Sequence, residues 1–326
     1  MPGIWAVGEV ADGAPTRLTL ELATLARKLG EAASSKAATV LIGQGAAGAA
    51  EEAAKYGPAV LVVEADGADR PISSVVATRL AKLIDERAPD YVLVGASNDG
   101  KDLAGLLVGL TDLPILANGA GVDWADAAPR VEMSTFGGKL VTHSTFTGQR
   151  GIVIVRPATV SAEAAPTGGK VETVDIQPEE ELPEVRITDR VEEAGAAAPI
   201  EEARIIVGGG RGVGSPDGFR QVEELAQALG GAVGATRAVV DAGWIGYGQQ
   251  IGQTGKIVKP ALYVACGISG AIQHKVGVQT AGTIVAINKD AEAPIAEFAD
   301  LMVVGDLFEI LPRLTEAVRA HKSGNG

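Results

Sequence analysis

The chain is poor in several residue types, and each shortage excludes something. One cysteine, Cys266, is present among 326 residues, so no disulfide can form within the chain, and a reducing compartment is expected. The three histidines are not accompanied by a clustered second set of His or Cys residues, which argues against a metal site. Aromatic residues make up only 4%. The abundance of Ala and Gly beside Val, Ile and Leu suits closely packed helices on a buried parallel sheet.

Positive charge and long apolar runs are scarce as well. The formal net charge is −13 at pH 7, which argues against nucleic-acid binding because a phosphate backbone requires a basic face. An acidic surface suits solubility or docking onto a basic protein partner. No apolar run reaches the ~18 residues of a membrane span. The start, "MPGIWAVGEVADG", does not resemble a secretory signal. We therefore expect a soluble, cytoplasmic protein.

The first half of the chain alternates strand-like and helical patterns. Four apolar runs predict strands, at residues 4–10, 38–44, 59–66 and 91–97. Apolar spacings predict two intervening helices, one with Leu18, Leu22, Leu25 and Leu29 on its face and one with Val75, Val76, Leu80, Leu83 and Ile84. Such alternation is typical of βαβ units and a parallel sheet.

The middle of the chain has a different character. Glycines between strand-like runs over 114–160 predict a strand meander that closes the first sheet. Residues 161–202 are small, acidic and interrupted by proline, and we interpret them as a linker. Some strand pairing is considered there for "KVETVDI" (170–176) and "EVRITDR" (184–190). We place the domain boundary near residue 200.

The second half returns to alternating strands and helices. Strands are predicted at residues 203–212, 261–267, 283–289 and 301–306. One predicted helix carries Phe219, Val222, Leu225, Ala226 and Leu229 on one face, and another, with Pro312 inside it, ends the chain. The sequence thus predicts an α/β fold of two domains. Residues 1–200 would form a Rossmann-like parallel-sheet domain, and residues 201–326 a doubly wound domain.

Polar and glycine-rich loops follow the strands of the second half. They are "VGGGRGVGSPDGF" with Arg211, "GATRAVVDAGW" with Thr236 and Arg237, "QQIGQTGKIV" with Gln250, Gln253 and Thr254, and "ACGISGAIQHKVG" with Ser269, Gln273 and His274, followed by Asn288 and Asp306 at two strand ends. Open α/β sheets bind ligands at the carboxyl ends of their strands. Glycines there let backbone N–H groups approach a phosphate. Ser269 would be a helix N-cap or a phosphate donor.

Each loop also has a plain explanation: a tight turn, a solvated arginine, an ordinary polar loop or a simple helix cap. Cys266 lies inside an apolar strand, where thiols are usually inert, so nucleophilic catalysis is not expected from it. One extended ligand with phosphates, hydroxyl groups and a polar ring would use all of these loops together.

Five segments, in this order, resemble the α subunit of electron transfer flavoprotein. They are "IGQTGK" (251–256), "GISGAIQH" (267–274), "TIVAINKD" (283–290), "EAPI" (292–295) and "VVGDLFE" (303–309). The resemblance covers the whole second half. The first half is similar more loosely, through "LVGASNDGKDLAG" (93–105) and the meander after it.

The resemblance implies a non-covalently bound FAD that lies extended along the strand ends of the second domain. The residues it places at the cofactor are Arg211, Thr236, Arg237, Gln250, Ile251, Gly252, Gln253, Thr254, Ser269, Gly270, Ala271, Ile272, Gln273, His274, Asn288, Asp306 and Leu307. Thr236 stands where the family usually has Ser.

Individual roles follow from the same resemblance. Arg237 would lie over the isoalloxazine and favour its anionic reduced forms, and Thr254 would lie near flavin N5. Residues 269–273 would wrap the ribityl-pyrophosphate. His274 would donate to the pyrimidine carbonyl. The AMP half would be held by Asn288, Asp306 and Leu307.

The function implied is that of an electron carrier without substrate turnover. The N-terminal domain would pack with a β subunit that holds AMP, and residues 161–202 would form a hinge about which the FAD domain moves. Electrons would come from dehydrogenases, such as the acyl-CoA dehydrogenases of fatty acid oxidation, and pass to a membrane quinone oxidoreductase. Trp244 and the "IGYGQQ" loop differ from common members, which keeps open an electron-bifurcating, NADH-linked relative with a second FAD in the partner. Two other classes are a nucleotide-sensing module and an NAD-dependent dehydrogenase, for which no convincing acid–base residue is found.

Overall fold

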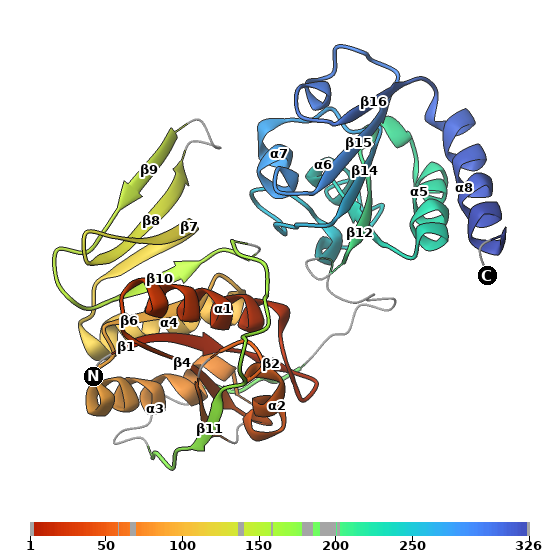
Figure 1. The fold of residues 1–326 in the computed structure, drawn as a ribbon. Coiled ribbons are helices and arrows are strands. Elements are labelled where there is room, and N and C mark those ends of the chain that lie inside the picture. The colour runs from red at the N-terminus through yellow and green to blue at the C-terminus, as the bar shows by residue number, and fades with distance from the viewer. Residues whose placement is uncertain are drawn as a thin grey trace. The chain divides into compact units, whose positions relative to one another are not determined.

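The computed structural model describes residues 3–57, 59–65, 70–135, 140–157, 159–177, 185–189, 200 and 203–324. The chain divides into two compact units, Met1–Arg190 and Val191–Gly326, and each is described here by itself (Figure 1). The boundary predicted near residue 200 falls in a stretch, 190–202, of which only residue 200 is described. Among the described residues, no helix is both long enough and apolar enough to cross a membrane.

The first unit is built on a mostly parallel sheet that, within its described residues, has nine strands in the order β11-β5-β4-β1-β6-β10-β7-β8-β9. The strands are β1 (Gly3–Gly8), β4 (Lys36–Gly43), β5 (Ala59–Glu64), β6 (Tyr91–Gly95), β7 (Ile115–Ala125), β8 (Ala128–Thr135), β9 (Leu140–Ser144), β10 (Gly151–Val155) and β11 (Lys170–Thr173). A small hairpin of β2 (Val10–Ala11) and β3 (Ala14–Pro15) follows β1.

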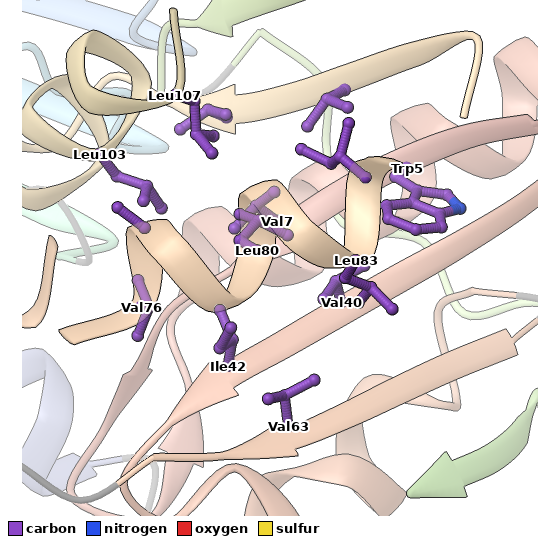
Figure 2. Packing of buried hydrophobic residues seen from close by; sticks show 14 of the residues in the cluster. Trp5, Val7, Val40, Ile42, Val63, Val76, Leu80, Leu83, Leu103 and Leu107 are labelled. Atoms are coloured by element: carbon purple, nitrogen blue, oxygen red, sulfur yellow. The ribbon is translucent and has the colours of Figure 1, made fainter. Parts of the chain in front are cut away.

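Helices cover both faces of the central strands. They are α1 (Arg17–Ala32), α2 (Ala46–Ala53), α3 (Ile72–Arg87) and α4 (Asn98–Thr111). Figure 2 shows α3 laying Val76, Leu80 and Leu83 against Val40 and neighbouring side chains of the sheet. The leucine face of α1 packs on the opposite side of β1, and α2 covers β4 and β5 on that side. Burial on both faces explains why these strands are continuously apolar, as the sequence predicted.

The amino end of α2 is closed by a side chain of the protein itself. The backbone N–H groups of Gly45 and Ala47 donate to the two carboxylate oxygens of Glu64, at 3.2 and 2.6 Å. Glu64 is the last residue of β5, so the carboxylate lies at the carboxyl edge of the sheet. A negative charge at a helix amino terminus is stabilising because the helix dipole is positive there.

The predicted meander over 114–160 is only partly correct. β7, β8 and β9 pair antiparallel, as expected. The run Gly151–Val155 does not belong to the meander, because β10 pairs parallel with β6 on one side and with β7 on the other. All five of its residues are buried. A continuous apolar run is the pattern of a strand covered on both faces, whereas a meander with one solvated face alternates.

The predicted linker and hinge over 161–202 is wrong for residues 161–177. β11 extends the first sheet by pairing parallel with β5, so the pairing considered for "KVETVDI" is confirmed. The N–H groups of Ala165 and Gly169 donate to the carbonyls of Lys55 and Ala54, both at 2.6 Å. Residues 185–189 form no regular structure, and the rest of the predicted hinge lies outside the described residues, apart from residue 200.

The second unit contains, among its described residues, a five-stranded parallel sheet in the order β13-β12-β14-β15-β16. The strands are β12 (Ile205–Gly209), β13 (Ala232–Ala235), β14 (Leu262–Cys266), β15 (Thr283–Asn288) and β16 (Leu301–Val304). The helices are α5 (Pro216–Leu229), α6 (Arg237–Val240), α7 (Ile272–Val278) and α8 (Leu307–Gly324), with short 3₁₀ turns η3 (Arg211–Val213), η4 (Tyr247–Gln249) and η5 (Pro294–Glu297). The predicted α/β class is confirmed.

The strand order of the second sheet creates a crevice at one edge. From β12 the chain moves to β13 on one side, and the later strands β14, β15 and β16 lie on the other. The helices that follow β12 and β14, α5 and α7, therefore pack on opposite faces of the sheet. Open α/β sheets bind ligands at such a switch point.

Candidate functional site

A cavity of about 630 Å³ lies at the carboxyl ends of the strands of the second unit. Its size is within the range of roughly 300–1,000 Å³ that is usual for small-molecule sites. Of the residues predicted for the site, the following line it: Arg211, Thr236, Arg237, Ile251, Gly252, Gln253, Thr254, Ser269, Gly270, Ala271, Gln273, His274 and Asn288. The loops after β12, β13, β14 and β15 thus meet at one place.

Four predicted residues do not line the cavity. Gln250 is buried behind it, and its amide nitrogen donates to the carbonyl and the hydroxyl of Thr254, at 3.0 and 3.2 Å. Ile272 begins α7 with an exposed side chain. Leu307 is part of the core that α8 buries. Asp306 accepts from the Phe308 N–H at 2.9 Å, which caps the start of α8.

The glycines after β12 and β14 hold two loops against each other. The Gly210 N–H donates to the Cys266 carbonyl and the Gly212 N–H to the Gly267 carbonyl, both at 2.9 Å. A Cβ atom at Gly210 would collide with the Gly267 carbonyl oxygen, and one at Gly212 would lie 2.7 Å from the Gly267 Cα. The expectation that glycine frees these N–H groups for a phosphate is therefore wrong for Gly210 and Gly212. Their contribution is close loop packing beneath the cavity.

The loop that carries Thr254 is held from two sides. The Tyr247 hydroxyl donates to the Thr254 carbonyl at 2.7 Å, on the same oxygen that Gln250 reaches. On the other side, the Gln253 N–H donates to the Gln273 carbonyl at 2.7 Å. Gly252 has φ +143°, and a Cβ there would lie 2.8 Å from the same Gln273 oxygen, so glycine is required. The Thr254 side chain is thereby presented at the cavity from a fixed backbone.

Two arginines bring positive charge to the cavity. The aspartate that pairs with one of them was not predicted from the sequence. Arg237 is the first residue of α6, and its Nε lies 3.2 Å from Asp241 Oδ2. Asp241 also lines the cavity, as does Asp290. The spacing of four residues between Arg237 and Asp241 is that of a helical ion pair and could have revealed this aspartate. Arg211, in the loop after β12, is exposed and also lines the cavity.

Ser269 is not the N-cap of the helix that follows it. α7 begins at Ile272 with Ala271 in the capping position. Ser269 instead accepts the Ile295 N–H on its carbonyl oxygen at 2.9 Å, and its exposed side chain lies at the cavity. Cys266, just before this loop, is fully buried, and burial raises the pKa of its thiol to about 12. A thiol protonated in this way is inert, as expected from its strand.

Comparison with known proteins bears on what the cavity holds. The model of the family described as "Electron transfer flavoprotein domain" matches residues 4–181. A second model, "Electron transfer flavoprotein FAD-binding domain", matches residues 199–279. The chain belongs to the electron transfer flavoprotein alpha-subunit family. As a flavoprotein subunit of this family, it binds FAD.

Relatives align along nearly the whole chain. "Electron transfer flavoprotein subunit alpha" of Mycobacterium leprae (strain TN) is 42% identical over 321 residues, which cover 96% of this chain and 97% of the relative. The protein of the same name from Thermoanaerobacterium thermosaccharolyticum is 38% identical, over 98% of both chains. "Protein FixB" of Clostridium saccharobutylicum is 35% identical over 96% of this chain and 95% of its own.

The side chains at the cavity fit the chemistry of FAD. Arg211 offers positive charge and a planar donor group that match a pyrophosphate, and Arg237 offers positive charge suited to a ring system that gains electrons. Hydroxyl and amide groups suited to the other polar parts of FAD come from Thr236, Thr254, Ser269, Gln253, Gln273 and Asn288. The Asn288 side chain is itself held, because its amide nitrogen donates to the Ile268 carbonyl at 3.0 Å.

His274 is buried at the wall of this flavoprotein cavity with both ring nitrogens engaged. Nδ1 lies 3.1 Å from the Ile251 carbonyl oxygen and Nε2 lies 2.9 Å from the Tyr263 hydroxyl. Desolvation lowers the pKa of His274 to about 4, against the opposing effect of the Ile251 carbonyl. The ring is therefore neutral at pH 7. The resemblance implies that His274 donates a hydrogen bond to a flavin carbonyl. To do so, the ring would have to break one of its two present hydrogen bonds or take up a proton.

Proposed function

We propose that the chain is the FAD-binding half of a heterodimeric electron carrier whose other half is a β subunit. The carrier accepts electrons from dehydrogenases, such as acyl-CoA dehydrogenases, and passes them to a membrane quinone oxidoreductase. The observation that supports this proposal is the meeting of the family-typical loops around one cavity in the FAD-binding domain. The β subunit would hold AMP, and the N-terminal unit would pack with it.

In this proposal, bound FAD supplies the redox chemistry, and the protein positions it and adjusts its potential. Arg237 stabilises negative charge at the ring system. Its ion pair with Asp241 weakens the positive potential that Arg237 contributes there. Thr254 orients one edge of the ring from the loop that Gln250 and Tyr247 hold. Ser269, Gln273 and Arg211 bind the ribityl-pyrophosphate section, and Asn288 the AMP half. Roles for Asp306 and Leu307, which lie outside the cavity, stay predictions.

The absence of turnover is part of the proposal. The titratable groups that line the cavity are Arg211, Arg237, Asp241, His274 and Asp290. Among them, His274 is neutral and Arg237 is paired with Asp241. Moving electrons between bound partners requires no proton donor and acceptor aligned on a substrate. A carrier suits this set of residues better than a dehydrogenase does.

The experiment that tests the proposal is a flavin count and a redox titration of the chain co-expressed with its β subunit. One FAD per heterodimer, reduced by an acyl-CoA dehydrogenase with its substrate and reoxidised by a quinone oxidoreductase, is the expected result. The chain purified without the β subunit serves as the control for assembly. Two FADs, one of them reduced by NADH, would replace the proposal with an electron-bifurcating function. A complex without flavin would overturn it.

A further inference from the structure

Tyr263 is a fully buried tyrosine whose hydroxyl contacts His274, a residue that lines the candidate FAD site. It lies on β14, beside Ile206 of β12, with no exposed surface. Its hydroxyl oxygen is 2.9 Å from His274 Nε2, and the two ring centroids are 5.9 Å apart. Its ring belongs to the apolar core on one face of the sheet. A buried hydroxyl is stable there only because it has a hydrogen-bonding partner.

The partners of His274 assign the direction of both hydrogen bonds. A carbonyl oxygen only accepts, so Nδ1 must carry the proton and donate to Ile251. In the neutral ring, Nε2 is then an unprotonated acceptor, and the Tyr263 hydroxyl must donate to it. Burial keeps the pKa of Tyr263 far above its usual range, so this donor is always protonated. If His274 took up a proton, the same hydroxyl oxygen could accept from Nε2–H instead.

The neighbouring strand is shaped to let Tyr263 reach this position. Gly208 of β12 lies two residues beyond Ile206, the strand partner of Tyr263, and therefore on the same face of the sheet. A Cβ atom at Gly208 would overlap the Tyr263 hydroxyl oxygen and would lie 2.7 Å from the ring carbon that bears it. Gly208 thus leaves the room in which the tyrosine extends toward the carboxyl edge. The glycine has a steric reason that is independent of any phosphate.

The contact connects the core to the loop that presents Thr254. Tyr263 holds His274 of α7, and His274 holds the carbonyl of Ile251. Ile251 begins the run Ile251–Thr254 at the cavity, and Gln253 in that run is bound to Gln273 of the same helix. Losing the hydroxyl would leave the buried Nε2 without its donor and the ring without one of its two anchors.

We propose that Tyr263 is a positioning residue for the flavin: by donating to His274 Nε2, it fixes the orientation of that ring and, through Ile251, the Ile251–Thr254 loop. The proposal rests on the proposed function, because it places FAD beside this loop. It concerns a residue that does not itself line the cavity. Because the hydroxyl acts through His274, substitutions of the two residues can be tested singly and together.

The first test is ¹⁵N NMR of the histidine rings, with the α chain labelled and the β subunit unlabelled. The chain has three histidines, so few signals need assignment. We expect His274 to show a protonated Nδ1 and an unprotonated Nε2 that accepts a hydrogen bond. In Tyr263→Phe, the Nε2 signal should move to the position of a nitrogen without a donor. Tyr91→Phe, a buried tyrosine of the first unit, is the matched control and should change nothing. An unprotonated Nδ1, or an Nε2 signal indifferent to Tyr263→Phe, would overturn the assignment.

The second test is a double-mutant cycle on the potential of the bound flavin. Tyr263→Phe should change the ratio of oxidised to reduced FAD at a fixed potential at least threefold, or about 28 mV for one electron at about 59 mV per tenfold change. In a His274→Ala background, the same substitution should have little effect, because its route to the flavin is gone. Equal shifts in both backgrounds, or no shift in either, would overturn the positioning role. A wild-type complex that lacks flavin would refute the proposed function, while the NMR result would still decide the Tyr263–His274 contact.

Discussion

At the scale of single residues, His274 shows how burial sets a charge state. The ring is 5% exposed, and desolvation is the largest effect on its pKa, which falls from 6.5 to about 4. The hydrogen bond to the Ile251 carbonyl acts in the opposite direction, since it favours the protonated ring, but it is the smaller effect. A neutral imidazole at the cavity wall contributes position and hydrogen bonds to the site, and no net charge.

This charge state predicts how stability depends on pH. Between pH 6.5 and about 4, the unfolded chain binds a proton at His274 that the folded chain does not bind. The free energy of unfolding of the second unit should therefore fall as the pH falls through this window, by up to about 3 kcal/mol, since one pKa unit corresponds to about 1.4 kcal/mol. Hydrogen exchange of peptides from residues 262–278, measured across this window, checks the slope. His274→Gln should flatten it, and an unchanged slope in that variant would contradict the assignment.

Arg237 and Asp241 predict a pair of opposite changes in flavin potential. Removing the cation by Arg237→Ala should lower the potential, because negative charge gained on reduction loses a favourable neighbour. Removing the carboxylate by Asp241→Asn should raise it. A unit charge at 4 Å in water is worth about 1 kcal/mol, or roughly 40 mV for one electron. The measurement is a spectroelectrochemical titration of the complex.

The control for this pair is Arg220→Ala. Arg220 is a surface arginine of α5 that pairs with Asp217 at 3.3 Å and does not line the cavity. It should leave the potential unchanged. Shifts of the same sign in the Arg237 and Asp241 variants would show that charge is not what these residues contribute.

At the scale of elements, the sequence was most informative where side-chain spacing is regular. The leucines of α1 and the apolar faces of α3 and α5 predict those helices because residues three and four apart share a face. α2 was not predicted from the sequence. Its sequence, AAGAAEEA, is short and has no large apolar side chain to mark its buried face. Packing against β5 and the Glu64 carboxylate at its amino end stabilise it, and both depend on tertiary structure.

The candidate site was predictable to the extent that it follows strand ends. Arg237, Thr254 and Ser269 each follow a strand or a glycine, and parallel strands bring their carboxyl ends to one edge. Tyr263 was not predictable in this way. It stands in an apolar strand, and nothing in the run LYVAC indicates that its hydroxyl meets a histidine eleven residues later. That contact depends on the space above Gly208, which only the paired strands reveal.

The fit between β12 and β14 predicts a sharp difference between two glycines of the second unit. Gly208→Ala should lower the free energy of unfolding by about 1–3 kcal/mol, the usual cost of overpacking, because the new methyl group overlaps Tyr263. Gly248→Ala adds its methyl to open space and should change stability by less than about 0.5 kcal/mol. Urea denaturation of both variants provides the comparison. Equal free energies of unfolding would mean that β12 shifts to accommodate the new methyl group. Gly208 would then not control the position of Tyr263.

At the scale of the whole molecule, the two units share one architecture but differ in the side chains at the carboxyl edge of the sheet. Each has parallel strands with helices on both faces, and in each the order of strands reverses beside the first strand, with a cavity at the carboxyl edge. The first unit has a cavity of about 790 Å³ at that edge, next to the ends of β1 and β4. The second has the cavity proposed for FAD. Strand topology alone would have given both units the same role, so the difference lies in the side chains at the edge.

The carboxylate of Glu64 makes that difference concrete. A nucleotide phosphate that sought the amides of Gly45 and Ala47 would have to compete with a group already bound there and joined to the same chain. Tethering gives such a group a local concentration on the order of millimolar or more. A free nucleotide at micromolar concentration would lose that competition and would also meet the repulsion of like charges. Glu64 would therefore act as an intramolecular competitor of any phosphate at the α2 amides of the first unit.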